Sequence, residues 1–98
     1  MTARNASAAI IGAGDFIGAA ISRKFAAEGF SVHAGRRNGD KLAPLLADIA
    51  KAGGSATGRS LDARKEDDIT AFLQEADAKA PLEVCVFNIG ANVNFPLL

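Results

Sequence analysis

The sequence has little of what marks several classes of protein. It has one cysteine, so no disulfide can form within the chain, and a reducing compartment is the expected setting. Its 11 Lys and Arg residues balance 11 Asp and Glu residues, so no overall field draws it to nucleic acid or to an anionic membrane. No apolar run approaches the roughly 20 residues that span a bilayer. These absences predict a cytoplasmic protein that binds neither nucleic acid nor membrane.

The single cysteine and the single histidine both fall in predicted strands. Cys85 lies in an apolar run, and we expect a buried core residue rather than a catalytic thiol. His33 has no cysteine or carboxylate nearby at ligand spacing, so we expect a packed or hydrogen-bonded strand residue rather than a catalytic or metal-binding group. The acidic cluster at residues 66–68 fits the start of a helix, where the helix dipole favours carboxylates. No metal site is expected.

Short apolar runs alternate with longer amphipathic stretches along the chain, as in successive strand–helix units. The predicted strands cover about residues 7–12, 30–35, 55–61 and 82–89. The runs at 8–11 and 84–87 are continuously apolar, which is typical of strands covered by helices on both faces. The expected fold is therefore α/β: a single domain over residues 1–98 with a partial, doubly wound parallel sheet of Rossmann type. It has about four strands in the order 3-2-1-4 and three helices.

Each predicted helix has an apolar stripe. The stripes comprise Ile17, Ala20, Ile21 and Phe25 in the first helix (about 16–28), Leu42, Leu45, Leu46 and Ile49 in the second, and Ile69, Phe72, Leu73 and Ala76 in the third. Gly29 and the pair Gly53-Gly54 are expected to end the first two helices in a left-handed conformation. Asp40 is the expected N-cap of the second helix, with Pro44 in its first turn.

A glycine-rich stretch, IGAGDFIG at residues 11–18, joins the first predicted strand to the first helix. Glycines at such a junction permit a tight turn and let the backbone approach a pyrophosphate, while the helix N-terminus offers unpaired N–H donors. The spacing Gly-x-Gly-x-x-x-Gly is one residue longer than the common dinucleotide fingerprint. Its place between strand and helix favours a phosphate cradle over a turn without a ligand. The residues expected to hold the cofactor here are Gly12, Gly14, Asp15, Phe16, Ile17 and Gly18.

The end of the second strand lies about 20 positions further on, where an acidic residue would accept the ribose hydroxyls of NAD. The sequence there is Gly35-Arg36-Arg37-Asn38, with no acid. A guanidinium offers two parallel donors to a phosphate, so Arg36 and Arg37, with Asn38 beside them, fit the 2′-phosphate of NADP. The alternative is a pair of solvated turn residues. NADP(H) is thus the preferred cofactor, and NAD(H) is a second that the same cleft could hold.

Two further strand ends point to the same cleft, because ligands of open parallel sheets bind outside the carboxyl ends of the strands. Asp62 follows the third strand and could cap the next helix, accept a hydrogen bond from the adenine amino group, or do both. Asn88 closes the fourth strand and can stabilise the backbone, while Gly90 leaves room for a ribose.

Together these segments resemble the N-terminal half of a short-chain dehydrogenase/reductase. In that family the glycine motif is usually Thr-Gly-x-x-x-Gly-x-Gly, whose outer glycines match Gly12 and Gly18 of this sequence, whereas Phe16 replaces the inner glycine. The family's Asn-Asn-Ala-Gly motif is altered to Asn88-Ile89-Gly90-Ala91. The resemblance implies that the backbone at Ile17 faces the pyrophosphate or nicotinamide, that Asp62 and Ala63 face the adenine, and that residues 88–91 face the adenosine ribose.

The resemblance also implies an activity, hydride transfer between NADP(H) and an alcohol or carbonyl compound. Family members carry a downstream serine and a Tyr-x-x-x-Lys motif, in which the tyrosine exchanges a proton with the substrate oxygen. This sequence has no tyrosine, so we expect no catalytic residue in it and no activity from the chain alone. The alternatives are a non-catalytic nucleotide-binding or regulatory module, and a truncated remnant that associates with itself.

The family sheet continues beyond its fourth strand, so residues 82–89 would form an open edge in this chain. An open edge invites pairing with another strand. The expected partners are therefore the dinucleotide and either a second copy of the chain, in a homo-oligomer, or a missing C-terminal half.

Overall fold

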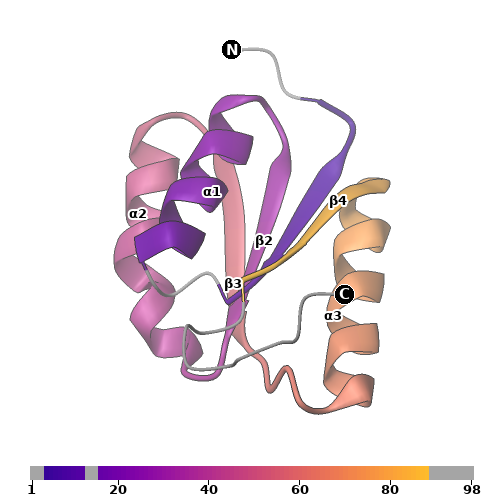
Figure 1. The fold of residues 1–98 in the computed structure, drawn as a ribbon. Coiled ribbons are helices and arrows are strands. Elements are labelled where there is room, and N and C mark those ends of the chain that lie inside the picture. Colours follow the sequence, from indigo (N-terminus) through magenta and orange to yellow (C-terminus); the bar gives the residue numbers. More distant parts are fainter. Residues whose placement is uncertain (1–3, 13–15, 89–98) are drawn as a thin grey trace, which may run out of the picture.

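The computed structural model describes residues 4–12 and 16–88. In order, the elements are β1 (Ser7–Ile11), α1 (Phe16–Ala27), β2 (Ser31–Arg36), a 3-10 turn η1 (Gly39–Leu42), α2 (Ala43–Lys51), β3 (Ser55–Ser60), α3 (Glu66–Lys79) and β4 (Leu82–Phe87). In this described part, the four strands are parallel and pair in the order β3-β2-β1-β4 (Figure 1). The predicted α/β fold and strand order are confirmed, with strand bounds that shift by one or two residues.

The sheet lies between two layers of helix, with α1 and α2 on one face and α3 on the other (Figure 1). Side chains of β1 alternate between the two layers, so Ala8 and Ile10 join the cluster under α1 and α2, whereas Ala9 and Ile11 join the cluster under α3. All five residues of β1 are buried, as predicted for a strand covered on both faces. Among the helices of the described residues, none has both the length and the hydropathy of a membrane span.

The predicted buried stripe of α1 is only partly correct: Ile21 and Phe25 pack against the core cluster, but Ile17 and Ala20 are exposed, and the fully buried residues of the helix are small. Gly18, Ser22 and Ala26 are buried, whereas Ile17 is 61% exposed. Small side chains at every fourth position let the helix lie close to the strands. The Ser22 hydroxyl donates to the Gly18 carbonyl oxygen at 2.9 Å, which pairs this buried polar group within the helix.

The helix ends follow the prediction in part. Gly29 and Gly53 have φ of 95° and 86°, as expected for left-handed helix stops, and Pro44 lies at the start of α2. Asp40 is not an N-cap, which corrects the prediction. Instead, the side chain of Asn38 accepts a hydrogen bond from the Asp40 N–H at 3.2 Å and caps η1, the turn that leads into α2.

His33 is a packed strand residue, as predicted. It is 8% exposed, and its Nδ1 lies 3.2 Å from the Thr57 hydroxyl of the neighbouring strand. Its Nε2 is buried and has no hydrogen-bond partner among the described residues. Burial lowers the pKa of His33; the negative charge of Glu75 opposes this shift and the positive charge of Lys79 adds to it.

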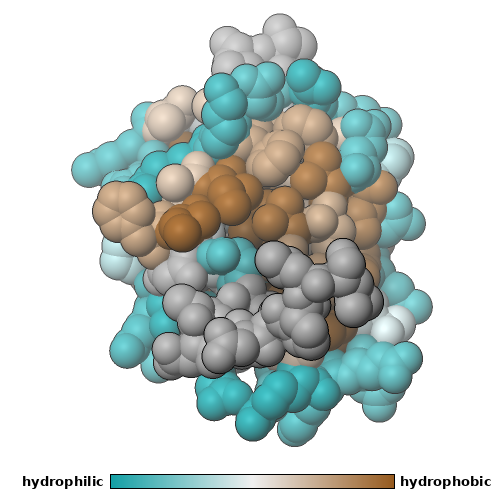
Figure 2. Space-filling view, viewed as in Figure 1, coloured by the Kyte–Doolittle hydropathy of each residue, from teal (hydrophilic) through white to brown (hydrophobic). Residues whose placement is uncertain are grey.

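Cys85 is exposed, which corrects its prediction as a core residue. Within the described residues β4 is an edge strand, and its side chains are partly buried or exposed throughout. Cys85 pairs in register with Ala9 and so lies on the α3 side, but α3 packs mainly over the inner strands. On the other face, Val84 and Val86 are only partly buried, and Figure 2 shows apolar residues at the surface across α1 and β4. The apolar run of β4 is therefore only half covered.

Candidate cofactor-binding site

The carboxyl end of β1 is tied to the strands on both sides. The Gly12 N–H donates to the Gly35 carbonyl oxygen, and the Asn88 N–H donates to the Ile11 carbonyl oxygen, both at 2.8 Å. The Asn88 side-chain amide also donates to the Gly12 carbonyl oxygen at 3.2 Å, the backbone role predicted for it. These bonds place Gly12, Gly35 and Asn88 together at the carboxyl ends of the parallel strands.

Gly12 occupies a position that only glycine fits. Its φ is 87°, and a Cβ at this position would lie 1.9 Å from the carbonyl oxygen of Asn88. A side chain would therefore be strained by its own backbone and would collide with the end of β4. The first glycine of the predicted cradle lets the ends of β1 and β4 approach closely.

The packing around residue 35, at the end of β2, favours glycine over the acidic residue that is absent there. A Cβ at Gly35 would lie 2.8 Å from Leu61 Cδ2 and 3.3 Å from the ring of Phe72. Both of these side chains are buried in the cluster under α3. A side chain at residue 35 would require Leu61 and Phe72 to shift, so their packing favours glycine at the position where an acid would bind an NAD ribose.

The two arginines predicted to bind a phosphate follow Gly35 directly. Arg36 is partly buried, pairs in register with Ser60, and accepts the Leu61 N–H on its carbonyl oxygen at 2.8 Å. Arg37 is exposed, and its charge contributes to a lower pKa of Asp62, so it lies near the end of β3. The Asn38 side chain, which was grouped with them, caps η1. The arginines thus bring positive charge to the same edge as Gly12.

Asp62 is held by Arg64. Its Oδ1 accepts the Arg64 backbone N–H at 3.0 Å and Nε at 3.1 Å, and its Oδ2 accepts Nη2 at 3.2 Å. The side-chain hydrogen bond from Arg64, then its backbone N–H, and to a smaller extent the charges of Arg64 and Arg37, lower the pKa of Asp62 to about 2. Asp62 is therefore an ionised hydrogen-bond acceptor at neutral pH.

The capping alternative for Asp62 is wrong, because the N-cap of α3 is Lys65, which makes no side-chain cap. The adenine alternative stays a prediction. Ala63, predicted beside it, packs against the cluster under α3. Sequence reasoning missed Arg64, although an aspartate followed two residues later by an arginine is a pattern that such a local turn favours.

The start of α1 lies at the carboxyl end of the sheet as well (Figure 1), where the helix begins at Phe16. Phe16 is 87% exposed, Ile17 is exposed as well, and Gly18 is buried against the sheet. The remaining predicted cofactor residues, Gly14, Asp15, Ile89, Gly90 and Ala91, lie outside the described residues.

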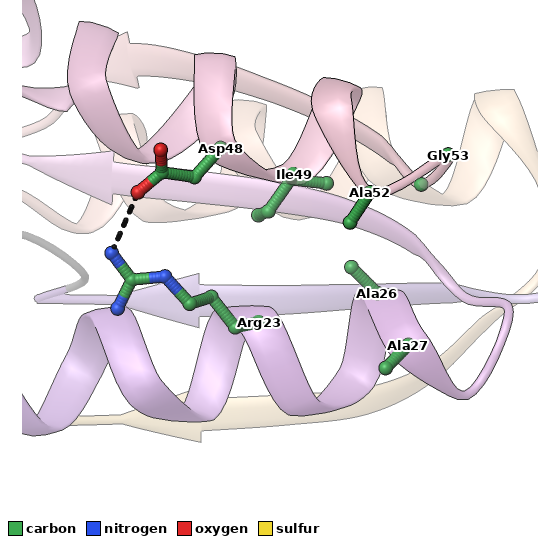
Figure 3. Close-up of a pocket in the computed structure, with 8 residues that line it drawn as sticks. Arg23, Ala26, Ala27, Asp48, Ile49, Ala52 and Gly53 are labelled. Atoms are coloured by element: carbon green, nitrogen blue, oxygen red, sulfur yellow. Dashed lines mark hydrogen bonds and ion pairs between the residues drawn. The ribbon is translucent and has the colours of Figure 1, made fainter.

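A cavity of about 310 Å³ lies away from these residues, between the last turns of α1 and α2 (Figure 3). Ala26, Ala27, Ile49 and Ala52 give it apolar walls, and the Arg23–Asp48 ion pair, at 3.1 Å, bridges the two helices beside it. It lies near the beginnings of β2 and β3, opposite the strand ends where the predicted site is found. None of the predicted site residues lines it.

A comparison with known protein families identifies the family of the chain. The short chain dehydrogenase family model matches residues 6–97. The chain belongs to this family, which confirms the resemblance. No curated protein matches the chain.

Solved structures are similar to the chain. A short-chain dehydrogenase from Rhodopseudomonas palustris is 71% identical, with a TM-score of 0.90 over 95% of this chain and 44% of that one. A metagenomic short-chain oxidoreductase in complex with NADP is 32% identical (TM-score 0.78; 91% and 41% of the chains). An actinorhodin polyketide ketoreductase with NADPH is 30% identical (TM-score 0.82; 91% and 35%). The chain spans less than half of the length of each of these proteins.

Proposed function

We propose that this chain is the cofactor-binding half of an NADP(H)-dependent short-chain oxidoreductase that acts on an alcohol or carbonyl group. The dinucleotide would lie across the carboxyl ends of the strands, with its phosphates near Gly12 and the start of α1. Membership of the family supports this function, and two similar proteins have structures with NADP or NADPH. The residues present fit the cofactor, because Gly12 has the left-handed conformation of a glycine turn at the end of β1, and Arg36 and Arg37 bring positive charge to the same strand ends.

The preference for NADP(H) is carried by one observation, the end of β2. Glycine occupies position 35, where a side chain would crowd Leu61, and Arg36 and Arg37 follow it. A guanidinium binds a phosphate through charge-assisted hydrogen bonds, whereas the ribose hydroxyls of NAD would find no carboxylate at Gly35. The same edge could hold NAD(H) more weakly.

Titration of the folded chain with NADPH and with NADH tests this preference. We expect Arg36→Ala to weaken NADPH binding by about 1 to 3 kcal/mol and NADH binding by less, because only NADPH carries the 2′-phosphate. Arg37→Ala tests the neighbouring guanidinium in the same way. Arg23→Ala is the matched control, since Arg23 is an exposed arginine of α1 whose ion pair with Asp48 of α2 (Figure 3) is separate from the candidate site. An equal loss for both cofactors would refute the phosphate assignment.

The bound nicotinamide would supply or accept the hydride. The chain contains no tyrosine, so the proton donor of the family's Tyr-x-x-x-Lys motif must come from outside these 98 residues. We therefore propose that the chain alone binds the cofactor without turning substrate over. Its partner would be either a C-terminal half or a second copy joined through β4, and its location would be the cytoplasm.

A second candidate, a nucleotide-binding module without chemistry, is favoured by the same lack of tyrosine. The parent reading frame separates the two candidates. A Tyr-x-x-x-Lys motif encoded downstream supports the oxidoreductase, whereas a frame without one supports the module.

A further inference from the structure

Two hydrogen bonds within the chain hold the backbone of Asp62 in place. Its N–H donates to Asp68 Oδ2 at 3.1 Å, and its carbonyl oxygen accepts the Lys65 N–H at 2.9 Å. The turn after β3 is therefore closed on both sides of the residue. These two bonds do not fix the direction of the Asp62 side-chain carboxylate.

Arg64 sets that direction with three donors, its backbone N–H and two nitrogens of its guanidinium. Two of them reach Oδ1 and one reaches Oδ2. An ionised carboxylate offers about four acceptor positions, two on each oxygen. Arg64 therefore leaves one position on Oδ2 for a further donor.

The exposure of the two side chains also differs. The Arg64 side chain is 74% exposed, whereas that of Asp62 is 22% exposed. The guanidinium thus lies on the solvent side of the carboxylate. Arg37 lies near enough to Asp62 to favour its charged form.

We propose that Arg64 is a positioning residue for adenine recognition: it orients the Asp62 carboxylate so that the remaining acceptor position on Oδ2 receives an N–H of the adenine amino group. The inference rests on the proposed function, because it assumes a dinucleotide at the strand ends. In this role Arg64 acts through Asp62 and not on the cofactor directly.

The test uses NADPH and its hypoxanthine analogue, in which an oxygen replaces the adenine amino group. The wild-type chain should bind NADPH more tightly than the analogue. Arg64→Ala should weaken NADPH binding about three- to tenfold and remove most of the discrimination, because one oriented hydrogen bond is lost. Arg64→Lys, which keeps a single point donor, should fall in between. Arg23→Ala should bind both ligands as the wild type does.

A double variant and a titration distinguish orientation from general damage. Asp62→Asn with Arg64→Ala should bind NADPH no more weakly than Asp62→Asn alone, because Arg64 acts through Asp62. In the folded Arg64→Ala chain without ligand, the pKa of Asp62 measured by NMR should rise from about 2 part of the way towards its ordinary value of 3.8, because the side-chain hydrogen bond is lost while the backbone N–H of residue 64 and the charge of Arg37 remain.

Each outcome decides a separate point. If the wild-type chain binds neither NADPH nor NADH, the proposed function is refuted and this inference with it. If the wild type binds NADPH but the two Arg64 variants keep its full discrimination, only the role of Arg64 is refuted. An unchanged pKa of Asp62 in Arg64→Ala also refutes that role.

Discussion

Replacement of Gly12 by alanine should destabilise the fold more than replacement of Gly53, although the two glycines share nearly the same backbone conformation. Their φ values are 87° and 86°. A Cβ at residue 12 would lie 1.9 Å from the Asn88 carbonyl oxygen, whereas a Cβ at residue 53 would meet nothing within 4 Å. The pair of variants therefore separates backbone strain from steric displacement.

The magnitudes follow from the contacts. The left-handed conformation costs an alanine about 1 to 2 kcal/mol, and this term is common to both variants. Relief of the clash in Gly12→Ala requires the end of β4 to move. That motion breaks two bonds of Asn88: the one from its backbone N–H to the Ile11 carbonyl oxygen and the one from its side chain to the Gly12 carbonyl oxygen. Each of these hydrogen bonds contributes about 0.5 to 1.5 kcal/mol. Gly12→Ala should therefore lower the free energy of unfolding by about 1 to 3 kcal/mol more than Gly53→Ala does.

Urea unfolding followed by circular dichroism measures the difference, provided that both transitions are two-state. The gain from a less flexible unfolded chain is shared by the two alanines and cancels in the comparison. Equal losses for the two variants would refute the close approach of β1 and β4 at the candidate site.

Three further predictions concern other parts of the fold. Phe72→Ala should cost about 3 to 5 kcal/mol in urea unfolding because Phe72 is 2% exposed, whereas Phe87→Ala, at a residue 50% exposed, should cost much less; similar losses would contradict the assigned core. His33 has a lowered pKa in the fold, so the unfolded chain binds the proton more readily, and the free energy of unfolding should fall as pH drops below about 6.5. Unfolding of His33→Gln at pH 8 and pH 5.5 should show a smaller pH dependence; an unchanged dependence would assign it to other groups. Cys85 should react with a thiol reagent in the folded chain, but more slowly at pH 8 than in the unfolded chain, because burial raises its pKa; labelling only after unfolding would contradict its exposure.

The sequence predicted the fold well because its periodic signals are strong and local. Apolar runs separated by glycine stops located the strands and helices, and Gly29 and Gly53 end their helices as expected. The buried face of α1 could not be predicted from apolar content alone. There the close approach of helix and sheet favours Gly18 and Ser22 over larger side chains.

The burial of β4 depends on how many neighbouring strands it has. The sequence of the strand itself does not contain this information. Residues 84–87 have the composition of a fully buried strand, but β4 pairs only with β1 in the described residues. Cys85 is exposed for this reason and not because of its own chemistry.

At the candidate site, the sequence placed the strand ends correctly, because the carboxyl ends of parallel strands meet at one edge. It could not show that Gly35 lies close against Leu61 and Phe72, which come from distant parts of the chain. Nor could it show that Arg64 turns back onto Asp62, since side-chain direction in a turn depends on the backbone.

The central claim, that a dinucleotide binds at the carboxyl ends of the strands, is tested most directly by following backbone amide NMR signals during titration with NADPH. The claim predicts that the signals of Gly12, Arg36 and Asp62 shift together and saturate at one affinity. Shifts confined to Ala26 and Ala52, which line the cavity between α1 and α2, or no shifts at all, would contradict it.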